Sequence, residues 1–233
     1  MVTSFQLRTW HKWLALVLGL QVAVWCVSGL YMVSFDIDFI RGLPLVREHK
    51  TKLPADAPLT PFSSIAGRYA DVTGATLRTL PDSNEPVYEL STREGRVLVD
   101  AVSGAQRSPL PQARIEALAR TYYAGKGQIE RIELIATAPV EIRGRALPVW
   151  RIDFDDALAT SFYVAPDTGA LITRRHRYWR LFDTFWMLHI MDYGYERDDM
   201  NNLLLRFASA AGVVFGVTGL WLLFFSFRRR AAR

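Results

Sequence analysis

Two long apolar stretches separate a polar middle segment from the two ends of the chain. Residues 13–35 carry no charged side chain, and residues 207–227 carry none either, directly after Arg206. As a helix with a rise of 1.5 Å per residue, the first stretch is about 35 Å long, which exceeds a hydrocarbon core of about 30 Å. We therefore predict transmembrane helices at residues 13–35 and 203–227, and a membrane protein of the α+β class.

The first stretch has an alternative interpretation as a secretory signal peptide, because it follows Arg8 and Lys12. Its apolar run is longer than the usual run of about 7 to 15 residues in signal peptides, and no small-x-small cleavage site follows it. Bulky Tyr31 and Phe35 occupy its far end. We therefore expect this helix to stay attached to the protein.

The distribution of charge predicts how the protein lies in a membrane. All 23 acidic residues fall in the middle segment, which also holds 21 of the 28 basic residues and so has a net charge of −2. Positively charged residues beside short segments stay in the cytoplasm. We therefore predict a cytoplasmic head (residues 1–12), a cytoplasmic basic tail (228–233) and a periplasmic middle at a bacterial inner membrane. The net charge of +5 is then topological and does not indicate nucleic-acid binding.

The middle segment contains an internal repeat of about 60 residues, with matching turns and strands. In each copy a helical pattern precedes strands with alternating apolar positions, and turns end in Gly104 or Gly169. The predicted parts are a linker (36–57), two α+β repeats (58–110 and 111–177) and an amphipathic interfacial helix (178–195).

These patterns resemble a known family. The strands that end in Val99-Asp100 through Ser103-Gly104, and again in Val164-Ala165 through Thr168-Gly169, are similar to the PepSY domain. The flanking segments resemble the PepSY-associated transmembrane family; the residues that carry this likeness are Trp10-His11-Lys12-Trp13, Ser28-Gly29-Leu30-Tyr31-Met32, Phe185-Trp186, Leu188-His189 and Asn201-Asn202-Leu203.

The resemblance implies two different functions. Larger relatives are inner-membrane ferric-siderophore reductases that carry haem between helices, and smaller two-span relatives are implicated in ferric iron reduction for uptake. By this resemblance the protein assists iron reduction or uptake, with haem-mediated electron transfer and an iron-uptake or electron-donor partner. Other PepSY domains occur in protease propeptides, so the alternative is a non-enzymatic module that binds or inhibits a peptidase or assists an envelope complex. A fold does not choose between these functions.

Two of the four histidines are candidate ligands for haem b. His11 lies at the cytoplasmic mouth of the first span and His189 on the outward side before the second, so one subunit cannot bring both to one iron. A homodimer could pair each histidine with its own copy and hold one haem in each leaflet. The alternative for both is a simple interfacial anchor among aromatic and basic residues. His49 and His176 lie in polar segments, where we expect solvated side chains.

Other polar groups receive simpler interpretations. We expect the basic cluster to contact anionic lipid, with an anionic siderophore or an electron-donor partner as the alternative; its members are Arg174, Arg175, Arg177 and Arg180. Acidic residues between Asp153 and Asp156 and around Asp198 are predicted to be solvated turns, with a transient iron site near Asp198 and Asp199 as the alternative and no resident metal site assigned. Gly212 and Gly216 form a small-xxx-small pair that allows close helix packing or dimerisation. No catalytic residue is assigned, because no motif of a hydrolase or nucleotide-binding enzyme is present.

Overall fold

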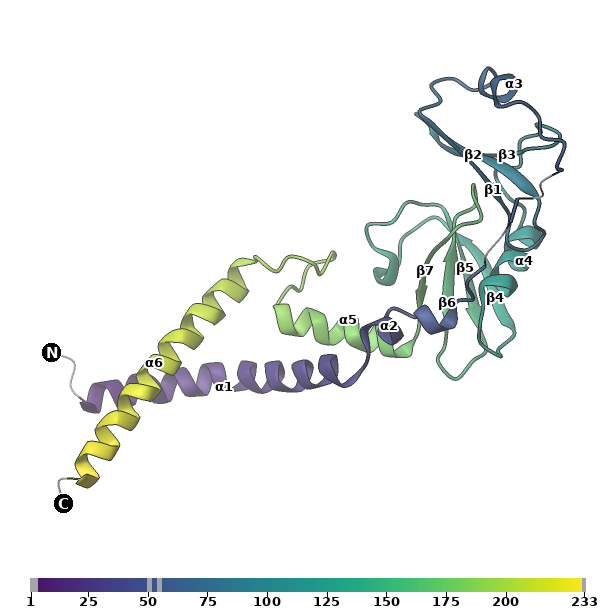
Figure 1. Ribbon diagram of the computed structural model, residues 1–233. Coiled ribbons are helices and arrows are strands. Elements are labelled where there is room, and N and C mark those ends of the chain that lie inside the picture. Colours follow the sequence, from purple (N-terminus) through teal and green to yellow (C-terminus); the bar gives the residue numbers. More distant parts are fainter. Residues whose placement is uncertain (1–3, 50–51, 54–55, 232–233) are drawn as a thin grey trace. The chain divides into compact units, whose positions relative to one another are not determined.

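The computed structural model describes residues 4–49, 52–53 and 56–231, which form two compact units (Figure 1). One unit combines Met1–Asp36 with Leu181–Arg233, and the other is Ile37–Arg180. We call them the membrane unit and the domain. The first three residues of the predicted head, the last two of the predicted tail and four of the predicted linker lie outside the described residues.

The membrane unit consists of helices. It contains α1 (Ser4–Ser34), most of α5 (Arg177–Ile190) and α6 (Leu203–Ala231). The segments long and apolar enough to cross a membrane are Arg8–Ser34 and Leu203–Phe224, and only 11% and 6% of their most apolar windows are buried. The core helix of a soluble protein would be covered, so these exposed apolar surfaces are suited to lipid.

The helices continue beyond the predicted spans, before residue 13 in α1 and after residue 227 in α6. Arg8 and Lys12 lie outside the uncharged run but within α1, because lysine and arginine favour helical geometry. Helix α6 begins at Leu203, where the Asn202 side-chain oxygen accepts the Leu205 amide at 2.8 Å and caps the helix.

The first half of the domain is a short helix followed by an antiparallel sheet. The sheet has the order β1-β2-β3, so β1 and β3 are its outer strands. Two short turns of helix follow α1, namely α2 (Ile37–Ile40) and η1 (Leu43–Leu45). The helix and strands of this half are α3 (Phe62–Ala66), β1 (Gly74–Thr79), β2 (Pro86–Thr92) and β3 (Gly95–Asp100).

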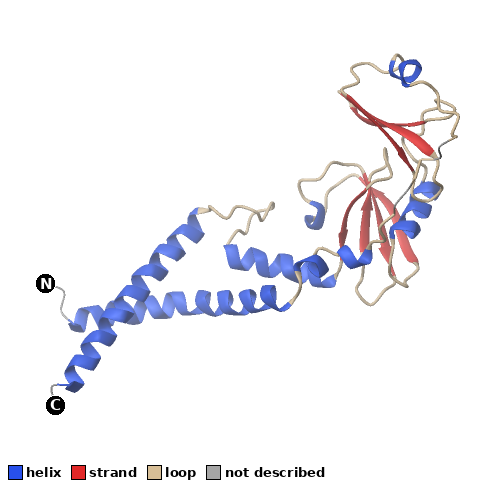
Figure 2. Ribbon diagram, viewed as in Figure 1, coloured by secondary structure: helices blue, strands red, loops and turns tan. Residues whose placement is uncertain are grey.

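The second half repeats the order of a helix followed by antiparallel strands, with one strand more (Figure 2). The strand order is β4-β5-β6-β7. The elements are α4 (Gln112–Tyr122), β4 (Ile129–Ile135), η2 (Val140–Ile142), β5 (Val149–Phe154), β6 (Ser161–Val164) and β7 (Leu171–Arg175). The prediction of a membrane α+β protein is therefore confirmed.

The turns after β3 and β6 depend on glycine in the same way. Gly104 and Gly169 have φ values of 69° and 68°, in the left-handed region that side chains disfavour. A Cβ atom at Gly169 would also lie 2.5 Å from Leu118 Cδ1. The two turns predicted from the sequence are present for this reason.

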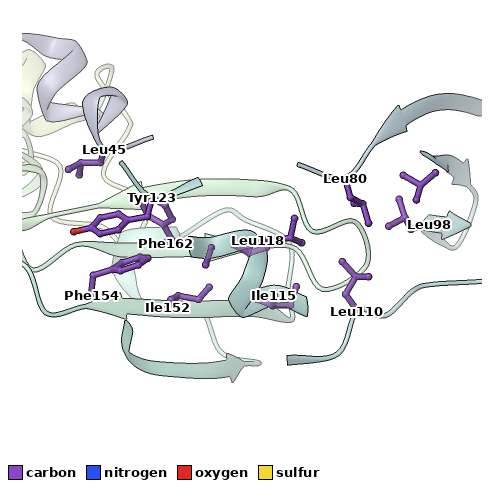
Figure 3. Packing of buried hydrophobic residues seen from close by; sticks show 13 residues of the cluster. Leu45, Leu80, Leu98, Leu110, Ile115, Leu118, Tyr123, Ile152, Phe154 and Phe162 are labelled. Atoms are coloured by element: carbon purple, nitrogen blue, oxygen red, sulfur yellow. The ribbon is translucent and has the colours of Figure 1, made fainter. Parts of the chain in front are cut away.

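Both sheets of the domain are covered on both faces. The largest cluster contains residues of both sheets and of α4, which contacts β5 and β6 (Figure 3). Val87, Leu98, Ile152 and Phe162 point into this cluster, whereas alternate residues such as Tyr163 point to the opposite face. Successive side chains of a strand point to opposite faces of the sheet, so neighbouring residues are both buried only where other parts of the chain pack on both faces.

Truncation at the centre of this cluster should destabilise the domain. Ile152 is fully buried, so Ile152→Ala is expected to lower the free energy of unfolding by about 2 to 5 kcal/mol. Leu134→Ala, at a half-exposed position of the neighbouring strand, is the control and should cost less than about 0.5 kcal/mol. Urea unfolding of the detergent-solubilised protein measures both. Equal destabilisation by the two changes would contradict the assignment of the core.

Candidate functional site

His11 of α1 is held against α6 by three contacts. Its Nδ1 atom lies 2.9 Å from the Thr218 hydroxyl oxygen. One face of the imidazole stacks on Phe215, with ring centroids 4.5 Å apart and planes 5° from parallel. The edge of the ring lies over Gly219, where an added Cβ would come within 3.2 Å of His11 Cε1. The ring is therefore fixed in orientation by a neighbouring helix.

His189, in the last turn of α5, is held in a similar way against α1. Its Nδ1 atom lies 2.8 Å from the Ser28 hydroxyl oxygen, and its ring edge lies beside Gly29. The Trp25 indole donates to the His189 main-chain carbonyl at 2.8 Å, which fixes the backbone as well. Ser28 itself is completely buried.

The two histidines occupy separate places in the membrane unit. His11 and Ser28 are 17 positions apart on one helix, which corresponds to about 25 Å. Each histidine contacts a neighbouring helix at a hydroxyl residue that is followed by glycine. His11 of α1 contacts Thr218-Gly219 of α6, and His189 of α5 contacts Ser28-Gly29 of α1. The sequence analysis missed Thr218, although the matching Ser-Gly and Thr-Gly dipeptides were a usable signal.

The other two histidines belong to the domain and differ from each other. His49 is exposed, and its Nε2 atom lies 2.8 Å from the Thr121 carbonyl oxygen. His176 is completely buried, with Nε2 at 2.9 Å from the Phe39 carbonyl and Phe39 and Tyr178 rings beside it. The prediction of a solvated His176 is wrong, because aromatic neighbours cover a residue whose sequence neighbours are arginines.

The basic cluster is largely bound within the domain. Arg180 contacts the Glu141 carboxylate at 2.7 Å and the Ser161 hydroxyl at 2.8 Å. Arg175 donates to the Glu141 carbonyl and lies over the Trp179 ring, and Arg174 donates to the Arg41 carbonyl. These guanidinium groups therefore hold the first turn of α5 and its approach in place, which the expectation of a simple lipid contact did not include.

The acidic residues near β5 are bound in the same way. Asp153 accepts hydrogen bonds from Arg151 and Ser161, and Asp156 accepts from Tyr123 and Thr160. They are thus structural acceptors and not solvated turns. Among the described residues no group of three or more His, Cys, Asp or Glu side chains is arranged to hold a metal ion.

The fold and these contacts define a membrane protein of the α+β class, with two apolar helices on either side of a domain of two sheets. The family model described as PepSY-associated TM region matches residues 8–233, and the chain therefore belongs to this family. The resemblance inferred from the sequence is confirmed. Comparison with curated proteins finds no match, and comparison with solved structures finds none either.

Burial of His176 should make the stability of the domain depend on pH. Burial lowers the pKa of His176, and the hydrogen bond to Phe39 offsets only part of this effect. The folded state therefore binds a proton less readily than the unfolded state, whose histidine pKa is about 6.5. The stability contributed by neutral His176 is complete above pH about 6.5 and is lost as the pH falls below that value.

This effect is measured as the change in the urea midpoint between pH 7.5 and pH 5.5. His176→Gln keeps a donor for the Phe39 carbonyl but cannot titrate, so the midpoint should change less with pH than in the unmodified protein. His49→Gln removes an exposed histidine of the same domain and is the control. A pH dependence that is unchanged in His176→Gln would contradict this explanation.

Proposed function

We propose that the protein assists the reduction or uptake of ferric iron, free or bound to a siderophore, by carrying electrons across the bacterial inner membrane. The single observation that supports this most is the pair of imidazoles in the membrane unit, each fixed through Nδ1 to a hydroxyl of another helix. An imidazole anchored in this way is the usual form of a histidine that binds a metal through its other nitrogen.

The residues at both places fit a haem group. The donor set is imidazole nitrogen, which haem iron accepts as an axial ligand, and no thiol or carboxylate lies among the contacts of either ring in the described residues. Glycine beside each ring allows the imidazole to lie close to the neighbouring helix. Haem b held by His11 and His189 would supply a one-electron couple at each place.

The spacing of the two histidines suits transport across a bilayer. The separation of about 25 Å along α1 is close to a hydrocarbon thickness of about 30 Å. His11 would thus hold its group near the cytoplasmic face and His189 near the outer face. Arg8 and Lys12 beside the first position agree with a cytoplasmic end under the positive-inside rule.

A second copy of the chain would complete each site with a second imidazole. Cβ atoms added at Gly212 and Gly216 of α6 would meet nothing within 4 Å, so this face is open for another helix. Small residues at this spacing permit close approach of helices in membranes. We include a homodimer in the proposal for this reason, and an electron donor or iron-uptake protein as a further partner.

A second candidate is the module that binds a peptidase or an envelope protein. The observation in its favour is an apolar groove of about 470 Å³ beside the outer strand β1. Phe62, Leu77 and Tyr88 are among its lining residues. Outer strands with adjacent apolar pockets are sites where extended peptides add to sheets.

Haem content decides between the candidates. Protein purified after expression with adequate haem should show a Soret band, and a pyridine haemochrome assay should find haem b. His11→Ala and His189→Ala should each remove about half of the haem, and the double variant should remove all of it, because an axial ligand is lost at each place. His49→Ala is the control and should keep the full content. Colourless protein, with growth in low iron unaffected by deletion of the gene, would overturn the proposal in favour of the second candidate.

The proposed orientation is tested by cysteine labelling in a Cys26→Ala background. Glu94→Cys, in the exposed turn between β2 and β3, should react with a membrane-impermeant maleimide in cells whose outer membrane is permeabilised. Arg8→Cys should react only after the inner membrane is broken, because the positive-inside rule places it in the cytoplasm. The reverse pattern would exclude a periplasmic domain.

A further inference from the structure

The hydroxyl groups of Ser28 and Thr218 each lie close to main-chain carbonyl groups of their own helix and to a histidine. Ser28 Oγ lies 2.7 Å from the Val24 carbonyl oxygen and 2.8 Å from His189 Nδ1. Thr218 Oγ1 lies 2.9 Å from the Phe215 carbonyl oxygen and 2.9 Å from His11 Nδ1. Ser28 Oγ also lies 3.3 Å from the Trp25 carbonyl oxygen. Each hydroxyl is therefore placed between a carbonyl of its own helix and a histidine.

These contacts favour one tautomer of each neutral imidazole. A carbonyl oxygen only accepts, so when each hydroxyl donates its hydrogen to the carbonyl of its own helix, the hydroxyl oxygen accepts from the ring. The hydrogen between the hydroxyl and the imidazole therefore belongs to Nδ1. A neutral imidazole carries one N–H, so Nε2 has a free lone pair in both His11 and His189.

We infer that Ser28 and Thr218 are positioning residues, which keep His189 and His11 in the Nδ1–H form so that Nε2 is the atom that faces a ligand. The inference rests on the proposed function in taking haem iron as that ligand. The tautomers are inferred from contacts within this chain, so they are testable without haem.

The surroundings of each ring leave little freedom for the alternative tautomer. Rotation of the His11 ring about χ2 would exchange Nδ1 for a carbon atom at Thr218 and so break this hydrogen bond. The Phe215 ring on one face and the Gly219 backbone at one edge restrict the same rotation. For His189, the bond from Trp25 to its carbonyl holds the residue beside Ser28.

The tautomers are measured on protein without haem. Two-bond ¹H–¹⁵N correlation spectra of histidine-labelled protein in detergent at pH 8 distinguish the two forms, and the His11→Ala and His189→Ala spectra assign the signals. Both residues should show the Nδ1–H pattern. Ser28→Ala should shift only His189, and Thr218→Val only His11, towards the Nε2–H form.

Two further variants separate a positioning role from a general effect on folding. Ser34→Ala removes a hydroxyl on the same helix that donates to the Leu30 carbonyl at 2.6 Å but has no histidine beside it, and should leave both spectra unchanged. Ser28→Thr and Thr218→Ser keep a hydroxyl and should restore the Nδ1–H form. Nε2–H signals in the unmodified protein, or Nδ1–H signals that survive both hydroxyl deletions, would overturn the inference.

Haem titration then connects the tautomer to the proposed function. Loss of either hydroxyl should weaken haem affinity about 10- to 100-fold at its own site, in the range found when partners of metal-binding histidines are removed. If the spectra show the expected tautomers but haem does not bind, the positioning role stands and the proposed function fails. If haem binds equally well in the hydroxyl variants, the positioning role fails and the proposed function stands.

Discussion

The last carbonyl groups of α5 need hydrogen-bond donors, and the arrangement of the membrane unit follows from how they obtain them. A helix leaves its final carbonyls unpaired, and beside an apolar span there is little water to bind them. The carbonyls of Leu188, His189 and Ile190 accept from Gln21, Trp25 and Asn202, respectively. Gln21, Trp25 and Ser28 are spaced so that they share one face of α1. The polar residues that interrupt the first span thus pack it against α5, and this packing places His189 beside Ser28.

In the domain, charged side chains supply the hydrogen-bond partners that buried polar groups need. Glu141 accepts from Tyr163 through its carboxylate, and the same carboxylate pairs with Arg180. The Ser161 hydroxyl donates to Asp153 and accepts from Arg180. Because these polar atoms have partners, Ser161 and Tyr163 of β6 can be buried without the cost of unpaired groups. The first turn of α5 is part of this network and belongs to the domain.

The sequence was sufficient where the physical signal is local. Uncharged runs of adequate length predict the spans, and glycine after Ser103 or Thr168 predicts the turns, because both depend on neighbouring residues alone. It was insufficient where burial depends on distant segments. His176 lies among arginines in the sequence, yet Phe39, 137 positions earlier, covers it. His11 and His189 were identified as candidate ligands, but their partners Thr218 and Ser28 are 207 and 161 positions away, so their tautomers could not be read from spacing.

The carboxylates of the domain and the imidazoles of the membrane unit differ in how far their hydrogen bonds leave them able to bind a ligand. In the domain, Asp153 and Asp156 are held by arginine, tyrosine and hydroxyl donors, so a cation bound there would have to displace these bonds. In the membrane unit, the contacts of His11 and His189 use Nδ1, and in the tautomer that we infer Nε2 keeps an unshared electron pair. A polar side chain in a span is costly unless its position serves a purpose. The same dipeptide pattern, a hydroxyl residue followed by glycine, supports one imidazole at each end of α1, and such duplication favours a pair of equivalent ligand positions over two unrelated anchors.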